Sequence, residues 1–156
     1  MMKIIDATIE YSKEISELML YDLKSPNPKF PQEMINSLRE HAQEGSVRKE
    51  FDNPELISFL ALDGNTVVGF IVGYKNAQEN NAMIHYITSR KSEVKDKLLK
   101  EFVMLCKLKG VRKIITDTFE FMDNNEFFKK SGFVLVKKEN ITLSLEMLWY
   151  ELIMKH

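Results

Sequence analysis

Two spacings of apolar residues follow each other along this chain, one typical of strands and one typical of helices. Residues 82–87 form a short, mostly apolar run that predicts a strand, and residues 88–93 are polar enough to predict a turn. Apolar residues then recur every four positions, at Val94, Leu98, Phe102 and Cys106. This period predicts a helix with one apolar face. A helix that begins directly after a strand points its free N–H groups and its positive dipole end above the sheet edge, so the succession predicts an anion site.

Cationic side chains lie at the start of this predicted helix. Arg90, Lys91 and Lys95 could reach a pyrophosphate. Ser92 could add a hydroxyl donor, whereas the carboxylate of Glu93 would repel a phosphate unless it turns outward. The turn contains no glycine, so a phosphate cannot approach the backbone as closely as in a glycine-rich loop. A solvated helix start that serves only as scaffolding is therefore the alternative interpretation.

The rest of the pattern completes an α/β order. Further strand-like runs lie at residues 3–8, 56–62, 66–74, 111–118, 134–136 and 146–153. The other helices are expected to start near Ser12, Pro31 and Asp123. Gly45 is expected to end the second helix, and residues 46–55 and 137–145 are expected to be connections.

The connections between these runs predict the topology. Asp63 and Gly64 separate two β-rich runs, which is a strong hairpin signal. Residues 82–87 and 111–118 flank a helix, so these two strands should be parallel and joined by a right-handed crossover. We expect an α/β fold with a mixed, mostly antiparallel sheet of about seven strands, flanked by about four helices. If the parallel pair splays at its C-terminal end, an extended ligand can lie between the two strands.

Composition limits the alternatives. The chain has 156 residues, which predicts a single domain over 1–156, and a formal net charge of −1, which predicts no nucleic-acid partner. Cys106 is the only cysteine, so no intramolecular disulfide can form, and the three histidines lie too far apart for a metal motif. No apolar run approaches about 18 residues, so we expect a soluble, cytoplasmic protein without a membrane partner.

Four short motifs occur in an order that is typical of one known family. Residues 63–70 resemble a hairpin usually written D-G-x-x-V-G-F, and residues 94–99 match the apolar frame of the helix after a cofactor loop. Residues 110–114 resemble the next helix-to-strand connection, and residues 127–133 resemble the late signature F-Y-x-x-x-G-F. Together these motifs resemble the GNAT superfamily of acetyl-CoA-dependent N-acetyltransferases, over essentially the whole chain.

The resemblance implies acetyl-CoA as co-substrate and no metal. The backbone of Tyr86, Ile87 and Thr88 would then polarise the thioester carbonyl. The acetyl-CoA loop, usually R/Q-x-x-G-x-G/A, aligns with residues 90–95, so the implied cofactor-binding set is completed by Arg90, Lys91, Ser92, Val94 and Lys95. Glu93 and Lys95 stand where the family has glycine.

A second departure concerns the acid of the reaction. The tyrosine that protonates the leaving thiolate in the family aligns with Phe128, which has no proton to give. Tyr74, Tyr86 and Tyr150 are the candidate substitutes. The asparagine expected before the last helix has two loose candidates, Asn124 and Asn125.

Two residues are candidate catalytic bases. His85 lies in the predicted strand before the cofactor loop and titrates near neutrality. Asp117 lies near the end of the next strand. A solvent-facing or sheet-bound histidine and a capping or solvated aspartate are the structural alternatives.

The function implied is transfer of an acetyl group from acetyl-CoA to a primary amine of a small molecule or protein, by direct attack. The alternative is a non-catalytic GNAT-fold binding or interaction module. By family analogy, Phe30, Met34, Ile35 and Leu38 would line the acceptor side. Phe119, Phe121, Phe127 and Phe128 are expected to cover the core or the sheet. A homodimer could pair through the C-terminal strands, with Trp149 and Tyr150 in the contact.

Overall fold

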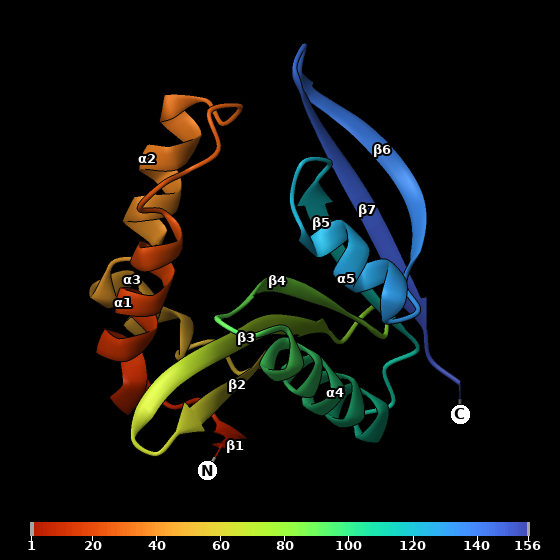
Figure 1. The fold of residues 1–156 in the computed structure, drawn as a ribbon. Coiled ribbons are helices and arrows are strands. Elements are labelled where there is room, and N and C mark those ends of the chain that lie inside the picture. Colours follow the sequence, from red (N-terminus) through yellow and green to blue (C-terminus); the bar gives the residue numbers. More distant parts are fainter. Residues whose placement is uncertain (1, 156) are drawn as a thin grey trace.

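The computed structural model describes residues 2–155 (Figure 1), and a seven-stranded sheet runs through it. The strands are β1 (Met2–Asp6), β2 (Leu56–Asp63), β3 (Thr66–Asn76), β4 (Asn81–Ser89), β5 (Lys113–Phe119), β6 (Val134–Thr142) and β7 (Leu145–Ile153). The helices are η1 (Ile9–Tyr11, a 3₁₀ turn), α1 (Ser12–Asp22), α2 (Gln32–His41), α3 (Glu44–Glu50), α4 (Ser92–Leu108) and α5 (Asn124–Lys130).

The strand order across the sheet is β1-β2-β3-β4-β5-β7-β6. Every neighbouring pair is antiparallel except β4 and β5, which are parallel and joined through α4. This confirms the mixed sheet with one parallel pair. Figure 1 shows β1 to β4 and β5 to β7 as two halves of the sheet that diverge from each other.

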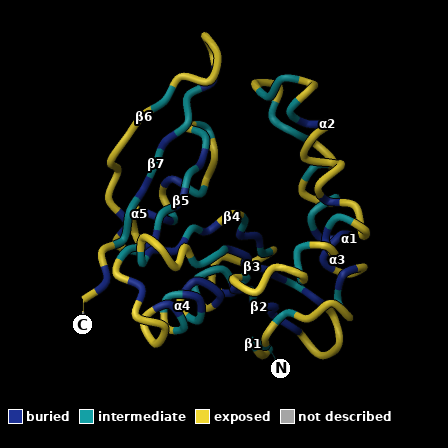
Figure 2. The backbone as a smooth tube through the Cα atoms, turned by 180° about the vertical axis from the view of Figure 1, so that it is seen from behind, coloured by how far each residue is buried: buried dark blue, intermediate teal, exposed yellow. Residues whose placement is uncertain are grey.

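Opposite faces of β2 and β3 are covered by different helices, because successive strand residues point to opposite sides. Phe59 and Ala61 belong to the apolar cluster that contains the buried stripe of α4 and reaches Phe128 and Tyr150. Leu60, between them in sequence, belongs to a second cluster built with α1 and α3. Figure 2 shows buried backbone concentrated at β2, β3 and α4, and exposed backbone along most of β6.

Two glycines of β3 allow α4 to approach this strand closely. A Cβ built on Gly73 would lie 2.1 Å from the carbonyl oxygen of Met83 and 2.7 Å from the ring of Phe102. A Cβ on Gly69 would lie 2.9 Å from Leu98 and 3.0 Å from Val94. Helix and strand therefore touch at positions where any side chain would separate them.

Three expectations about local structure are wrong. Gly45 does not end α2, which stops at His41, but lies inside α3, a fifth α-helix where a connection was expected. Val47 is the only buried residue of α3, so this short helix shows no apolar period in the sequence. Ser12 is the first residue of α1 rather than its N-cap, and its hydroxyl donates to the carbonyl of Ile9, 2.6 Å away.

The last hairpin is longer than expected. β6 continues through residues 137–142, which the sequence pattern assigned to a connection. Only Leu143 and Ser144 lie between β6 and β7. Most of β6 is exposed, so no alternation of buried and exposed positions indicated a strand. None of the described helices is long and apolar enough to span a membrane.

Candidate functional site at the fork between β4 and β5

The parallel pair forms a fork. Residues Asn81–Ile84 pair with Lys113–Thr116, and the described pairing between β4 and β5 stops there although both strands continue. At the last paired position, the buried hydroxyl of Thr116 donates to the carbonyl of Ile84 at 3.2 Å. Beyond it, β4 keeps β3 as its neighbour on one side only, so backbone groups facing β5 are free of the ladder. The predicted splay is confirmed.

A β-bulge places His85 at this fork. Ile84 pairs with Gly73 and Tyr86 pairs with Val72, so His85 is the extra residue of β4. Tyr86 packs on the apolar cluster of α1 and α3, and His85 meets the ring of Tyr74 on the same side of the sheet. His85 is exposed, but desolvation by the surrounding protein lowers its pKa, which favours the neutral imidazole that a base requires.

Asp117 is the first residue of β5 beyond the last paired position. It lies opposite Trp149 of β7 and, two residues before Phe119, faces the side of the sheet away from the core. Burial raises the pKa of Asp117, and the charge of Glu139 on β6 raises it further. His85 and Asp117 thus follow the end of the ladder on neighbouring strands, but Glu139, not His85, is the charged neighbour that shifts Asp117.

The amino end of α4 follows β4 after two residues. No side chain caps this end, and Lys91 precedes the first turn in an extended conformation. Ser89 accepts the N–H of Lys91 through its hydroxyl oxygen at 3.0 Å. Arg90 lies over the ring of Tyr21 at 4.7 Å, and Ser92 is exposed. The uncapped first turn, with Arg90 and Lys91 beside it, has the character of an anion site.

Lys95 is turned toward α5. Its ammonium donates to the side-chain oxygen of Asn124 and lies 5.0 Å from the centre of the Phe127 ring. Burial lowers the pKa of Lys95, an effect that the charges of Asp123 and Asp22 oppose. Lys95 therefore bridges α4 and α5 as a partly buried cation whose hydrogen-bond partner is a neutral amide.

The remaining cofactor candidates cannot offer their side chains to a ligand. The side chains of Ile87, Thr88 and Val94 are buried, and Val94 packs above Gly69. The amides of Val94 and Lys95 already donate to the carbonyl of Lys91, at 3.2 and 3.3 Å.

None of the three tyrosines considered as an acid has a free hydroxyl. Tyr74 donates to the Oε2 atom of Glu50 at 3.2 Å, and Tyr86 donates to the carboxylate of Asp22. Tyr150 is completely buried, so it also cannot form the contact predicted for a dimer. Phe128, at the position of the family's tyrosine, is 1% exposed and belongs to the core.

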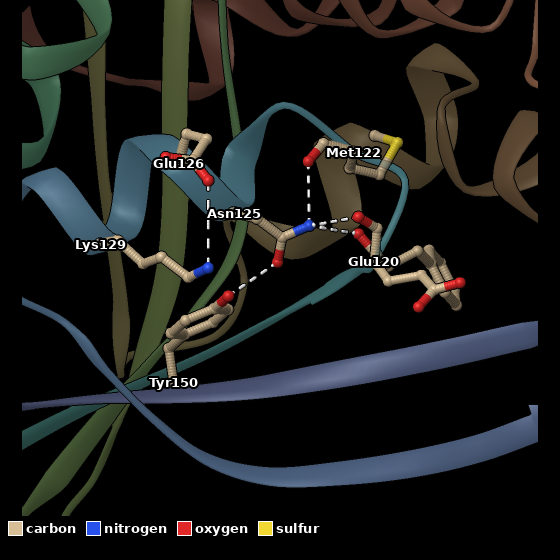
Figure 3. A network of polar contacts seen from close by, with 7 residues as sticks. Glu120, Met122, Asn125, Glu126, Lys129 and Tyr150 are labelled. Atoms are coloured by element: carbon tan, nitrogen blue, oxygen red, sulfur yellow. Dashed lines mark hydrogen bonds and ion pairs between the residues drawn. The ribbon is translucent and has the colours of Figure 1, made fainter.

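Asn125 has a role that the sequence did not indicate (Figure 3). Its Oδ1 atom accepts the hydroxyl of Tyr150 at 2.9 Å. Its Nδ2 atom lies 2.8 to 3.0 Å from the carbonyl oxygens of Phe119, Glu120 and Met122. Asn125, the second residue of α5, thus ties the loop after β5 to β7.

Aromatic side chains meet on the side of the fork where the family resemblance predicts the acceptor. Phe30, in the loop between α1 and α2, contacts Phe119 and Phe121 edge to face with ring centres 5.1 Å apart in each pair. Phe119 and Phe121 stack at 5.9 Å. Two surface cavities of about 570 and 350 Å³ lie elsewhere, one along β6 and β7 and one beside Phe51 and Leu56. Within residues 2–155, no group of three or more His, Cys, Asp or Glu side chains is arranged to hold a metal ion.

This arrangement of strands also occurs in solved structures of other proteins. No family model and no curated protein sequence matches the chain. Among solved structures, it is similar to an acetyltransferase of the GNAT family from Staphylococcus aureus, with a TM-score of 0.75 and 19% identity over 99% of this chain and 100% of that one.

Two further structures are similar at the same level. The PaiA N-acetyltransferase from Thermoplasma acidophilum, in complex with coenzyme A, has a TM-score of 0.73 and 20% identity over 96% of this chain and 98% of that one. The aminoglycoside 6'-N-acetyltransferase from Enterococcus faecium has a TM-score of 0.75 and 17% identity over 97% and 96%. The fork, the strand order and these similarities together show that the protein has the GNAT acetyltransferase fold.

Proposed function

We propose that this protein transfers an acetyl group from acetyl-CoA to a primary amine. The observation that carries the proposal is the fork, because β4 and β5 separate after Ile84 and Thr116 and the uncapped amino end of α4 follows β4 directly. An extended thioester fits such a gap, with phosphates near Arg90 and Lys91. The coenzyme A bound to a protein of the same fold supports the choice of cofactor.

The chain's own groups suffice for direct attack. Backbone N–H groups between Tyr86 and Thr88 donate to the thioester carbonyl oxygen. His85 accepts a proton from the amine, whose nitrogen bonds to the carbonyl carbon as the C–S bond breaks. The thiolate takes its proton from water, since the tyrosine hydroxyls near the site are engaged and a thiol of pKa about 8.5 is a fair leaving group.

A small-molecule amine is the acceptor that we favour. Two solved structures of similar fold are aminoglycoside 6'-acetyltransferases by name. The half-buried Phe30, Phe119 and Phe121 form an aromatic cluster on the side where we place this acceptor. Asp117 is a second candidate base on the same side of the sheet.

Thermal unfolding with acetyl-CoA tests the cofactor site. At 100 times its Kd, a ligand stabilises the folded state by about 2.7 kcal/mol, which for a chain of this size corresponds to a rise in Tm of roughly 5–10 °C. Lys95→Glu should reduce this rise, because it places a carboxylate beside the phosphates. Lys97→Glu, with the same charge change on the exposed side of α4, is the matched control. An unchanged Tm at millimolar acetyl-CoA would contradict the proposal.

A non-catalytic module is the second candidate, and the buried Phe128 in place of tyrosine favours it. Release of free thiol from acetyl-CoA in the presence of a panel of primary amines separates the two. An enzyme releases thiol faster with protein and amine together than with either alone. A module that only binds acetyl-CoA raises the Tm without any amine-dependent release.

A further inference from the structure

Three side chains from three elements form a row that ends at the fork. Glu50 is the last residue of α3, Tyr74 lies in β3 and His85 is the bulge residue of β4. The hydroxyl of Tyr74 donates to Oε2 of Glu50 at 3.2 Å, and its ring meets the imidazole of His85 edge to face, with ring centres 4.8 Å apart and planes at 83°.

Because His85 is a bulge residue, the orientation of its imidazole depends on side-chain contacts. A bulge residue lacks a direct partner across the ladder, so pairing with β3 does not fix the direction of His85. The second side-chain torsion of histidine is also broad by itself. Within residues 2–155, the structure shows the Tyr74 ring, and no side-chain hydrogen bond, as the contact that orients the imidazole. Both ring nitrogens therefore stay free to exchange a proton.

We propose that Tyr74, anchored by Glu50, is a positioning residue that holds the imidazole of His85 at the fork. The inference rests on the acetyl transfer proposed above, for which it names two further residues. Tyr74 acts through His85 and does not touch the reacting atoms.

The ionisation states of the row suit this role. Burial and the neighbouring Glu50 raise the pKa of Tyr74 to about 12, so the phenol remains a donor throughout the neutral range. Burial raises the pKa of Glu50, while the Tyr74 hydroxyl and the charge of His41 lower it. Asp117 of β5 and Tyr86 of β4, whose hydroxyl donates to Asp22, are further titratable groups at the fork.

A titration of the His85 imidazole by NMR tests the contact without any substrate. His85 is exposed, so the Tyr74 ring covers only one side of its imidazole. In Tyr74→Leu this aromatic contact is removed, and we expect a clear change in the ring resonances of His85, with its pKa moving toward its ordinary value as the desolvation by the ring is lost. Tyr74→Phe keeps the ring and should restore most of the wild-type titration. Tyr11→Leu, a half-buried tyrosine of the α1 side, controls for general loosening.

Kinetics test the consequence for the reaction. Tyr74→Leu should lower kcat about tenfold with little change in the KM for acetyl-CoA, and Tyr74→Phe should recover much of that loss. Glu50→Ala should lower kcat severalfold, whereas Glu50→Gln, which keeps an oxygen acceptor for the Tyr74 hydroxyl, should lower it less. These Glu50 variants also test the row if Tyr74→Leu does not fold.

The two proposals fail in different ways. If His85 titrates identically in wild type, Tyr74→Leu and Glu50→Ala, the positioning role is wrong even where acetylation is observed. If the titration changes as expected but His85→Asn acetylates amines as fast as wild type, Tyr74 and Glu50 orient His85 but His85 is not the base. That result overturns the proposed role of these residues in acetyl transfer.

Discussion

At the scale of single residues, Asn125 and Tyr150 were candidates for roles in the reaction, but their hydrogen bonds stabilise the fold. Asn125 and Tyr150 are 6% and 0% exposed, and each satisfies the other inside the core. The two hydrogens of the Asn125 Nδ2 atom are shared among three carbonyl oxygens. The residues that the family resemblance placed near the reaction thus hold the turn between β5 and α5.

This pair predicts a coupled loss of stability. Tyr150→Phe leaves the Asn125 oxygen without its buried donor and should cost about 1–3 kcal/mol in the free energy of unfolding. Asn125→Ala also removes the donor to three carbonyls and should cost about 2–4 kcal/mol. In urea unfolding, the double variant should lose at least about 0.5 kcal/mol less than the sum. Strict additivity would show that the two residues act independently.

A control lies on the same helix. Lys129 and Glu126 form an exposed pair at 3.9 Å (Figure 3), so Lys129→Met should change the free energy of unfolding by less than about 0.5 kcal/mol.

At the scale of elements, the bulge of β4 lies beside the close contact of α4 with β3 at Gly73. Gly73→Ala would place a methyl group 2.1 Å from the Met83 carbonyl, next to the bulge, and should cost at least about 3 kcal/mol or prevent folding. Gly45→Ala is the matched control, because its Cβ meets no atom within 4 Å inside α3. It should stabilise the protein by about 0.5–1 kcal/mol. Equal Tm values for both variants would contradict the packing described.

The sequence revealed those elements that carry a regular apolar pattern or a clear turn signal. The stripe of α4 was predicted because one face of the helix is buried, and the hairpin of β2 and β3 was predicted because two β-rich runs flank Asp63 and Gly64. The short α3 and the later part of β6, residues 137–142, were missed because their burial leaves almost no pattern. His85 was identified as a candidate from its place in a predicted strand. The bulge that brings it beside Tyr74 depends on how β4 pairs with β3, and the sequence of β4 alone does not determine that pairing.

At the scale of the whole molecule, the two halves of the sheet meet through a few side-chain contacts beyond the fork. Lys95 and Asn124 join α4 to α5, and Phe30 joins the loop before α2 to Phe119 and Phe121. These contacts lie on different sides: the first beside the proposed phosphate site, the second on the proposed acceptor side. A thioester and an amine that meet at the fork would approach it from these two directions.

This arrangement predicts that Phe30→Ala destabilises the contact of the loop before α2 with Phe119 and Phe121 and leaves the amino end of α4 unchanged. Loss of two edge-to-face contacts should cost about 1–2 kcal/mol, and amide hydrogen exchange in residues 24–31 should become severalfold faster. The rise in Tm with acetyl-CoA should be unchanged, because Arg90, Lys91 and the first turn of α4 are untouched. Leu38→Ala, on the partly exposed side of α2, should leave exchange in residues 24–31 as it is. Weakened acetyl-CoA binding in Phe30→Ala would instead place the aromatic cluster within the cofactor site.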